Sequence, residues 1–326
     1  MSRVAFLFRT DVHLADRSPD SWKGDYPAEI WSNLEQIGGL AREHKVDAVL
    51  DGGDYFHIKA ASKNSHAMVS RSALTQKGYP CPSYVIEGNH DITYNNLDSI
   101  ERQPLGVLFE TGVFHRLRDQ VFESGDLRVR VVGLPYSPNR TLEEIQAIQK
   151  QPGDTHLVLV LHQLAMEKPS RGVSEFFREE VFQYSDLVTP QGPDVFLFGH
   201  LHKDQGVVET GGKIFVNQGA VSRGALNQEN LDRQPQVALI ELVEGKPKIS
   251  LLPLVVAPAS EVFDLARKER ADQENHSVDQ FILRLQQDAT VDTSKSIEDN
   301  VQALSFAEDV RKVALEYLDR ARNETA

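Results

Sequence analysis

Histidine and aspartate residues follow five short apolar segments, at the point where each segment ends. The groups read Asp11-Val12-His13, Asp51-Gly52-Gly53-Asp54, Gly88-Asn89-His90-Asp91, His162 and Gly199-His200-Leu201-His202. Carboxylate, imidazole and amide donors without a thiolate suit manganese, iron or zinc, and they argue against a structural cysteine-type zinc site. These groups offer more ligands than one ion needs. Seven candidate ligands among them would suffice for two ions bridged by a shared carboxylate.

Strands that end at these groups are needed to position them. The apolar segments are rich in β-branched and aromatic residues, which favours strands over buried helices. The predicted strands are Val4–Phe8, Ala48–Leu50, Tyr84–Ile86, Val129–Val132, Leu157–Leu161, Val195–Phe198, Ile214–Val216, Val237–Leu242 and Ile249–Val256. Helices are predicted over Ala28–Glu43, His66–Gln76 and Thr141–Lys150. This order predicts a mixed α/β fold whose strand ends bring the polar groups to one edge.

The spacing within the groups adds a local expectation. Asp11 and His13, like His200 and His202, are two residues apart, so an extended backbone would place both members of a pair on one face. Each motif alone is weak evidence for function, whereas five in this order, each after a predicted strand, are difficult to obtain by accident. The histidines outside these motifs are expected to be ordinary surface or helix-face residues; they are His44, His66, His115, His156 and His276.

The ordered series D-x-H, G-D, G-N-H-D, H and G-H-x-H resembles the calcineurin-like metallophosphoesterases over roughly residues 4–220. The resemblance implies a four-layer α/β/β/α sandwich of two mixed sheets and a di-metal site. It implies that one ion is held by Asp11, His13, Asp54 and His202, and the other by Asp54, Asn89, His162 and His200. Asp54 would bridge the two ions. His90 would be the catalytic histidine, with Asp91 as its orienting partner.

A narrower resemblance concerns the residues around the first two motifs. Asp11-Val12-His13-Leu14 and Gly53-Asp54-Tyr55-Phe56-His57 look like the D-x-H-L and G-D-x-F-H signatures of the SbcD-like and Mre-type DNA nucleases. In that family the histidine three residues after the bridging aspartate positions the scissile phosphate, and His57 occupies this place. The segment 217–223 is similar to the family's segment after G-H-x-H. The resemblance implies DNA as the substrate and two divalent ions, manganese first, with iron, zinc and magnesium as alternatives.

The same resemblance implies partners. SbcD-like nucleases work with a coiled-coil ATPase of the SbcC type, and residues 277–322 would be the docking helices. A homodimer is expected through helices near 66–77 and 97–110. The chain is expected to divide into a nuclease domain at 1–258 and a short, mostly helical region at 259–326, with helices over Ala259–Asp272, Ser277–Gln287 and Ser305–Arg322. This last region would be a cap remnant or a partner-binding element.

Composition sets limits on the class of protein. The formal charge of −13, from 35 Lys and Arg residues against 48 Asp and Glu residues, excludes a broadly basic nucleic-acid coat. Bound divalent ions would still allow an anionic substrate. A single cysteine, Cys81, excludes an intrachain disulfide, and no signal peptide or membrane span is expected, so a cytoplasmic location is predicted.

Three functions remain open at this point: a DNA phosphodiesterase, a metallophosphoesterase acting on another phosphoester such as a nucleotide or a phosphoprotein, and a non-catalytic scaffold. The filled set of ligand positions disfavours the scaffold. Four basic residues are candidate phosphate contacts: Arg17, Lys23, Lys63 and Arg223. Trp22 and Tyr26 would either stack on a base or pack under the following helix.

Overall fold

The computed structural model describes residues 2–169, 171–177 and 179–266. The chain divides into two units, Met1–Leu265 and Ala266–Ala326. The expected helices at Ser277–Gln287 and Ser305–Arg322 lie outside the described residues. The first unit extends past residue 258, where we expected the nuclease domain to end, because α7 (Ala259–Val262) packs with it and the next residue, Phe263, is fully buried.

The first sheet has six strands in the order β14-β13-β1-β2-β3-β4. Its parallel part consists of β1 (Val4–Arg9), β2 (Ala48–Asp51), β3 (Ser83–Val85) and β4 (His115–Arg116). Two antiparallel strands, β13 (Gln236–Leu242) and β14 (Lys248–Pro253), extend it beside β1. The sheet is therefore mixed, and the carboxyl ends of β1 and β2 lie side by side.

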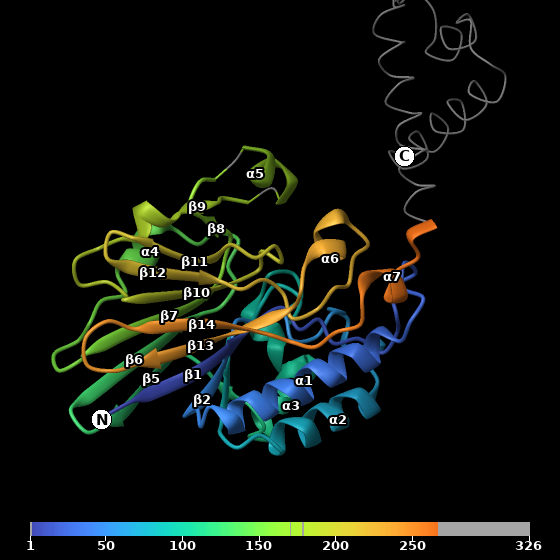
Figure 1. Cartoon of the computed structure of the whole chain (residues 1–326), viewed down its shortest axis with the longest axis horizontal. Coiled ribbons are helices and arrows are strands. Elements are labelled where there is room, and N and C mark those ends of the chain that lie inside the picture. The colour runs from blue at the N-terminus through green and yellow to red at the C-terminus, as the bar shows by residue number, and fades with distance from the viewer. Residues whose placement is uncertain (1, 170, 178, 267–326) are drawn as a thin grey trace, which may run out of the picture. The chain divides into compact units, whose positions relative to one another are not determined.

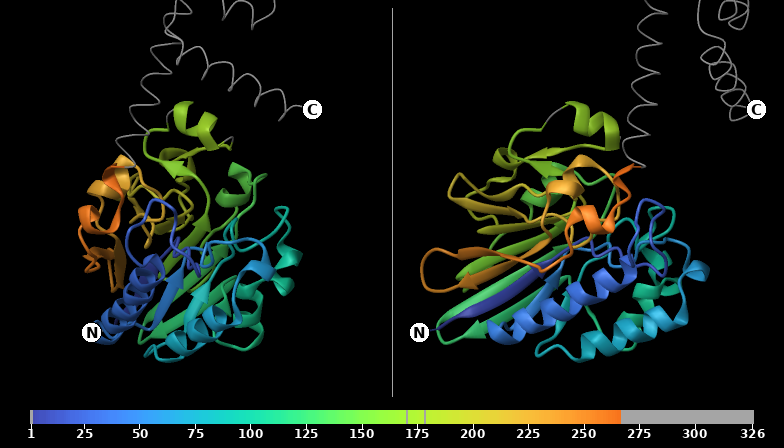
Figure 2. Two further views of the ribbon diagram at one scale, coloured as in Figure 1. Left: turned by 90° about the vertical axis from the view of Figure 1, so that its right-hand side faces the viewer. Right: turned by 45° about the vertical axis from the view of Figure 1, so that its right-hand side comes forward.

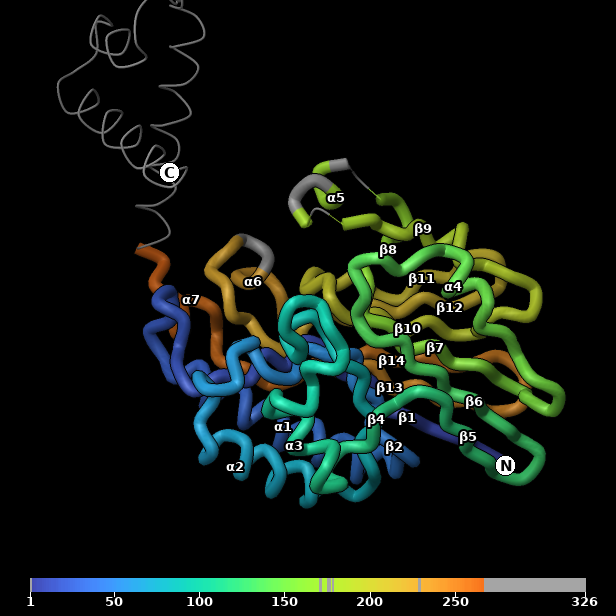
Figure 3. Tube along the Cα trace, turned by 180° about the vertical axis from the view of Figure 1, so that it is seen from behind, coloured from blue at the N-terminus to red at the C-terminus, as the bar shows by residue number. Residues whose placement is uncertain are grey.

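The second sheet also has six strands, in the order β11-β12-β10-β7-β6-β5. Parallel pairing joins β6 (Leu127–Leu134), β7 (His156–His162), β10 (Val195–Gly199) and β12 (Lys213–Asn217). The edge strands β5 (Asp119–Ser124) and β11 (Gly206–Thr210) pair antiparallel. A separate parallel pair, β8 (Ala165–Met166) and β9 (Phe182–Gln183), lies beside α5 (Arg171–Phe177) in Figures 1 and 3.

Side-chain alternation along β1 explains how the sheets are covered. Phe6 and Phe8 enter the apolar core shared by strands of both sheets, whereas Ala5 and Leu7 belong to the core beneath the helices. Those helices are α1 (Tyr26–Glu43), α2 (His66–Lys77) and α3 (Pro104–Glu110), which follows the 3-10 helix η2 (Leu97–Arg102). Figure 2 shows them together on the outer face of the first sheet.

A third apolar core covers the outer face of the second sheet. There, α4 (Leu142–Gln146) and the 3-10 helix η3 (Tyr184–Leu187) bury Ile145 and Leu187 against β7 and β10. Helix, sheet, sheet and helix thus form four layers, which confirms the predicted α/β/β/α architecture. A short η1 (Ala61–Lys63) precedes α2, and α6 (Gln228–Asp232) follows the second sheet. Among the described residues, no helix is long and apolar enough to cross a membrane.

Helix α1 illustrates why the sequence forms these elements where it does. Asp25 caps the helix by accepting a hydrogen bond from the backbone of Ala28, and a proline occupies the first turn. Ile30, Leu34 and Ile37 recur at helical spacing and are fully buried. The helix and the predicted segment Ala28–Glu43 agree to within two residues. The segment predicted over Thr141–Lys150 is shorter in the structure, where α4 covers five residues.

Candidate metal centre

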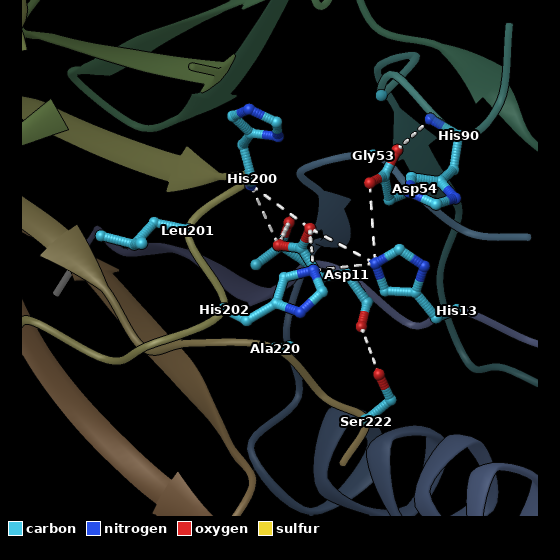
Figure 4. A network of polar contacts seen from close by, with 12 residues as sticks. Asp11, His13, Gly53, Asp54, His90, His200, Leu201, His202, Ala220 and Ser222 are labelled. Carbon is cyan, nitrogen blue, oxygen red and sulfur yellow. Dashed lines mark hydrogen bonds and ion pairs between the residues drawn. The ribbon is translucent and has the colours of Figure 1, made fainter. Parts of the chain in front are cut away.

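The predicted ligands meet where strands of the two sheets end. Asp11 follows β1, Asp54 follows β2, His162 is the last residue of β7 and His200 follows β10. All four side chains are buried. Figure 4 shows Asp11 and Asp54 close together, with the rings of His13 and His202 beside them and the side chain of Leu201 turned away. The structure therefore brings together residues that lie as far apart in the chain as Asp11 and His202.

One cluster contains a donor atom from each of Asp11, His13, Asp54 and His202, and these atoms all lie within 4.8 Å of one another. The Nε2 atoms of His13 and His202 are only 2.9 Å apart. Nε2 of His13 lies 3.6 Å from Oδ2 of Asp54, and Nε2 of His202 lies 3.6 Å from Oδ1 of Asp11. Two donors about 2.1 Å from one ion are separated by about 3.0–3.5 Å, so this cluster has the dimensions of a metal site.

A second cluster contains Asp54, His162 and His200. Nε2 of His162 lies 3.5 Å from Oδ2 of Asp54 and 3.1 Å from Oδ1 of Asn89, so the predicted fourth ligand is also at this place. The same Asp54 oxygen therefore faces both clusters. The other oxygen, Oδ1, accepts a hydrogen bond from the backbone of His90 at 2.7 Å. The His and Asp clusters suit a di-metal site in which Asp54 is shared.

The backbone at these residues is not extended, contrary to our expectation for the D-x-H and H-x-H pairs. Four of the predicted ligands have positive φ angles: 53° at Asp11, 47° at His13, 56° at Asp54 and 90° at His200. Non-glycine residues seldom adopt this region, although Asp and His tolerate it better than most. Backbone hydrogen bonds from Asp11 to Gly53 and from His13 to Asp54 hold the loops in this form. The strained loops, and not a regular strand, aim the donors inward.

Gly88 illustrates how little space the centre leaves. A Cβ atom at this position would lie 2.2 Å from Oδ1 of Asp54 and 2.4 Å from its backbone nitrogen. The glycine of the G-N-H-D motif is therefore needed so that its backbone can pass Asp54 closely.

Burial and neighbouring charges set the protonation of the imidazoles. Burial, together with the nearby His202, lowers the pKa of His13 well below its usual value, which favours the neutral form that binds metals. Burial alone would lower the pKa of His162, but the Asp54 carboxylate outweighs it and raises that pKa to about 9. The Asp54 carboxylate thus favours positive charge at this place, as it would favour a bound cation.

His90 and Asp91 do not form the pair that we expected. The Asp91 carboxylate accepts backbone hydrogen bonds from Gly88, Asp54, Tyr55 and Phe56 at 2.8–3.3 Å. Nδ1 of His90 instead donates to the backbone carbonyl oxygen of His57 at 2.6 Å. The expected role of Asp91 as the partner that orients His90 is therefore corrected: the His57 carbonyl orients the ring, and Asp91 holds the loops that carry Asp54.

His57 lies on the exposed side of the first cluster. Its Nδ1 is 3.3 Å from Nδ1 of His13, and its ring stacks on that of His90 with centroids 5.5 Å apart. Its exposure leaves the ring accessible to a ligand. His57 is exposed and His90 is half-buried, so these two imidazoles lie on the solvent side of the buried ring of His13.

Two residues at the centre belong to no motif that we recognised in the sequence. Glu179 places Oε2 3.1 Å from Nε2 of His200, and its Oε1 accepts a hydrogen bond from the hydroxyl of Tyr136 at 2.7 Å. Burial alone would raise the pKa of the Glu179 carboxyl, but hydrogen bonds from His200 and Tyr136 outweigh it and lower that pKa. Neither residue belongs to a group of metal-ligand residue types at the end of a predicted strand. Only the tertiary structure therefore shows that both lie at this centre.

Several residues considered as substrate contacts have structural roles. Arg223 is buried and pairs with Glu29 at 2.7 Å. Trp22 and Tyr26 are buried and pack edge to face, with ring centroids 5.1 Å apart, so core packing is the correct alternative for both. The remaining basic candidates, Arg17, Lys23 and Lys63, are exposed.

Known proteins resemble this chain in sequence. The model of the calcineurin-like phosphoesterase family matches residues 4–204. The DNA double-strand break repair protein Mre11 of Sulfurisphaera tokodaii is 24% identical over 236 residues, covering 71% of this chain and 57% of that protein. The protein of the same name from Archaeoglobus fulgidus is 24% identical, covering 69% of this chain and 52% of that protein. The chain thus spans little more than half the length of these two relatives.

Solved structures of related fold are more distant. A dimetal phosphatase from Danio rerio is 12% identical, with a TM-score of 0.49, and the match covers 77% of this chain and 96% of that one. The family assignment rests instead on the family model, which covers more than half of the chain and includes each of the five motifs. This chain belongs to the calcineurin-like phosphoesterase family.

Proposed function

We propose that this protein is a di-metal phosphodiesterase that hydrolyses DNA. The observation that carries the proposal is the position of Asp54, whose Oδ2 faces His13 in one cluster and His162 in the other at 3.6 and 3.5 Å. One oxygen between two sets of donors is the arrangement that a bridged metal pair requires. Asp11, His13, Asp54 and His202 would hold one ion; Asp54, Asn89, His162 and His200 would hold the other.

When bound, two divalent ions supply a hydroxide nucleophile near neutral pH and offset negative charge on the phosphate. The chain's own contribution to the reaction comes from the imidazoles of His57 and His90. A carbonyl oxygen only accepts hydrogen bonds, so Nδ1 of His90 carries a hydrogen and its Nε2 is left for the substrate. In its protonated form, His90 donates a proton from Nε2 to the departing oxygen. His57, beside it, contacts the scissile phosphate.

Support for DNA as the substrate comes from two sources. The phenylalanine–histidine pair after Asp54 matches the nuclease signature, and the similar Mre11 proteins are described as acting in DNA double-strand break repair. Exposed Arg17, Lys23 and Lys63 are available for phosphate contacts, whereas buried Arg223 is not. Because the chain is acidic overall, we expect DNA binding to depend on the metal ions and on a few loops.

Hydrolysis of a different phosphoester is the competing function. Linear duplex DNA and a small chromogenic phosphodiester should be compared under manganese, with a chelator as the control. We expect both to be hydrolysed with manganese and neither with the chelator. Turnover of the small ester without turnover of DNA would exclude the nuclease and retain the phosphodiesterase.

His90→Gln tests the assigned proton donor. The substitution should leave manganese binding intact and reduce hydrolysis by about 10²–10⁴-fold, because the imidazole lies outside both four-residue ligand sets. His66→Gln, on the exposed start of α2, is the matched control. Full hydrolysis by His90→Gln would remove His90 from the mechanism.

We also propose a homodimer and an ATPase partner. Leu74 on α2 and Val107 on α3 are 72% and 48% exposed, and apolar residues this exposed on neighbouring helices favour a contact with a second copy. Leu74→Glu should convert a dimer to a monomer in sedimentation velocity; a wild-type monomer would contradict the proposal.

The expected docking region for an SbcC-type ATPase, 277–322, lies outside the described residues, and co-purification with such an ATPase would test it.

A further inference from the structure

Glu179 connects one predicted metal ligand to a tyrosine on a different segment. It lies between α5 and β9, whereas Tyr136 follows β6 and His200 follows β10. The two carboxylate oxygens of Glu179 are divided between these partners: Oε2 faces Nε2 of His200 at 3.1 Å, and Oε1 accepts the Tyr136 hydroxyl at 2.7 Å. Three segments distant in sequence therefore meet in one chain of hydrogen bonds.

The chain of hydrogen bonds selects a tautomer of His200. An ionised carboxylate only accepts hydrogen bonds, so Nε2 of His200 must carry the hydrogen that Glu179 accepts. In a neutral imidazole, this leaves the lone pair of Nδ1 for a metal ion. Figure 4 shows one ring nitrogen of His200 on the side of Asp54 and the other turned away from it. The geometry therefore separates a metal-facing nitrogen from one that faces Glu179.

The surroundings keep the three side chains in place. His200 and Tyr136 are 8% and 5% exposed, and the Glu179 side chain is 20% exposed. The Tyr136 ring packs against those of His200 and His162, with centroids 5.5 and 6.1 Å away. The Tyr136 hydroxyl holds the Glu179 carboxylate in a site that is largely shielded from water. Such a carboxylate can hold the imidazole of His200 in one orientation more firmly than a water molecule would.

We propose that Glu179 is a positioning residue for the second metal site, that it acts through His200, and that Tyr136 supports it. Its hydrogen bond fixes the ring of His200 and makes Nδ1 a better donor to the ion. Partners of this kind, which accept the second N–H of a ligating histidine, change metal affinity by about 10–100-fold when they are removed. This role of Glu179 rests on the proposed di-metal centre. Manganese titration distinguishes a failure of the positioning role from a failure of the di-metal proposal.

The test is a calorimetric titration of the metal-free full chain with manganese at constant pH. Glu179→Gln keeps the size of the side chain and removes its charge, and Tyr136→Phe removes only the hydroxyl. Wild type should bind two ions. Glu179→Gln should weaken one of the two sites by about 10–100-fold and leave the other unchanged, and Tyr136→Phe should weaken the same site less. Glu180→Gln, which removes an exposed charge next in sequence, should behave as wild type.

A spectroscopic readout distinguishes positioning from a general loss of structure. At one manganese ion per site, the electron paramagnetic resonance spectrum of wild type should show a coupled pair of ions. Glu179→Gln should show mostly isolated manganese under the same conditions, and the coupled signal should return at higher metal concentration. A local defect affects one site, whereas a general folding defect would weaken both.

The outcomes divide as follows. Two unchanged sites in Glu179→Gln, or equal weakening of both sites, would overturn the positioning role while leaving the di-metal proposal intact. Wild type that binds no manganese would instead overturn the di-metal proposal. If Glu179→Gln does not fold, Tyr136→Phe is the remaining test. An unchanged manganese affinity of the second site in Tyr136→Phe would then overturn the proposal that the hydrogen bonds from Tyr136 through Glu179 to His200 position this site.

Discussion

At the scale of single residues, the carboxylate of Asp91 shows how a motif can be recognised while the role of one member is misassigned. The G-N-H-D motif places His90 and Asp91 next to each other in the chain, which suggests a pair. Their side chains diverge because Asp91 turns toward four backbone N–H groups around Asp54. A carboxylate in this position holds two loops together.

Asp91→Asn tests this role. An amide in place of the carboxyl group keeps one acceptor oxygen and leaves other buried N–H groups without an acceptor. We expect the free energy of unfolding of the metal-free protein to fall by about 2 kcal/mol, and manganese affinity to fall with it. Urea denaturation with and without manganese measures both effects. Unchanged stability combined with a loss of turnover alone would instead favour a role of Asp91 in orienting His90.

The candidate ligand residues could be predicted from the sequence, whereas the residues that contact them could not, for physical reasons. Asp11, Asp54 and His162 come at the ends of apolar strands, and this change of polarity is visible in a single sequence. Glu179 reaches the centre from a segment without such a pattern, and only the tertiary fold brings it to His200. The positive φ angles of the ligand residues likewise depend on contacts between loops.

At the scale of elements, Arg223 joins the segment after β12 to helix α1. Its guanidinium contacts Glu29 at 2.7 and 3.2 Å and donates to the carbonyl of Ala257, and its side chain is 2% exposed. Sequence position after G-H-x-H made it a candidate for DNA contact, whereas burial gives it a structural role. A buried ion pair is costly to break on one side, because the remaining charge has no partner.

Arg223→Met should therefore lower stability rather than substrate affinity. We expect a loss of about 3–5 kcal/mol in the free energy of unfolding, with little change in KM for DNA in the fraction that remains folded. Arg17→Met, at an exposed position, is the matched control and should leave stability unchanged. A stable Arg223→Met protein with strongly raised KM would contradict the structural role.

Asp194 connects elements at the opposite end of the second sheet. Oδ2 contacts Nζ of Lys150 at 2.7 Å and the backbone nitrogen of Leu157 at 2.9 Å, and Oδ1 lies 3.4 Å from Nζ of Lys213. Burial alone would raise the pKa of the Asp194 carboxyl, but hydrogen bonds from His156, Lys150 and Leu157 outweigh it and lower that pKa well below its usual range. The folded protein thus favours the ionised form more than the unfolded chain does.

The sign of the pH dependence follows from this shift. A carboxyl with a lowered pKa stabilises the fold above the unfolded value of about 4, and this contribution is lost as pH falls through the lower pKa of the folded state. Asp194→Asn should cost about 1–2 kcal/mol at about pH 7, and the difference from wild type should shrink toward acid pH. Denaturation curves at several pH values provide the measurement. A difference that stays constant with pH would show that the charge is not responsible.

The elements themselves were predicted to different degrees. The nine predicted strands are all present. Eight of them contain buried apolar residues, whereas β14 is half-buried or exposed along its length and lies at a sheet edge. Five strands among the described residues were missed. Three of them, β4, β5 and β11, lie at sheet edges and are largely half-buried or exposed, so their residues lack a continuous apolar run. The other two, β8 and β9, are only two residues long each. Helix α4 ends earlier than predicted because the residues after it begin the connection to β7.

At the scale of the whole molecule, two mixed sheets bring their strand ends together. Residues of distant segments, His13 and His162, therefore face the same carboxylate oxygen, Oδ2 of Asp54. The five ordered motifs predicted this arrangement, because parallel strands present their carboxyl ends at one edge. Pairing between β1 and β2 in one sheet, and between β7 and β10 in the other, places Asp54 within reach of His13 and His162. The central claim is that this shared oxygen supports a catalytic metal pair.

The most direct test is to measure manganese stoichiometry and phosphodiester hydrolysis together in wild type and Asp54→Asn, with Asp126→Asn in the exposed β5–β6 turn as the control. Removal of the shared charge should impair both sites at once. We predict two ions and manganese-dependent hydrolysis for wild type and the control, and the loss of both in an Asp54→Asn protein that still folds. An Asp54→Asn variant that binds two ions and hydrolyses the ester at the wild-type rate would contradict the account.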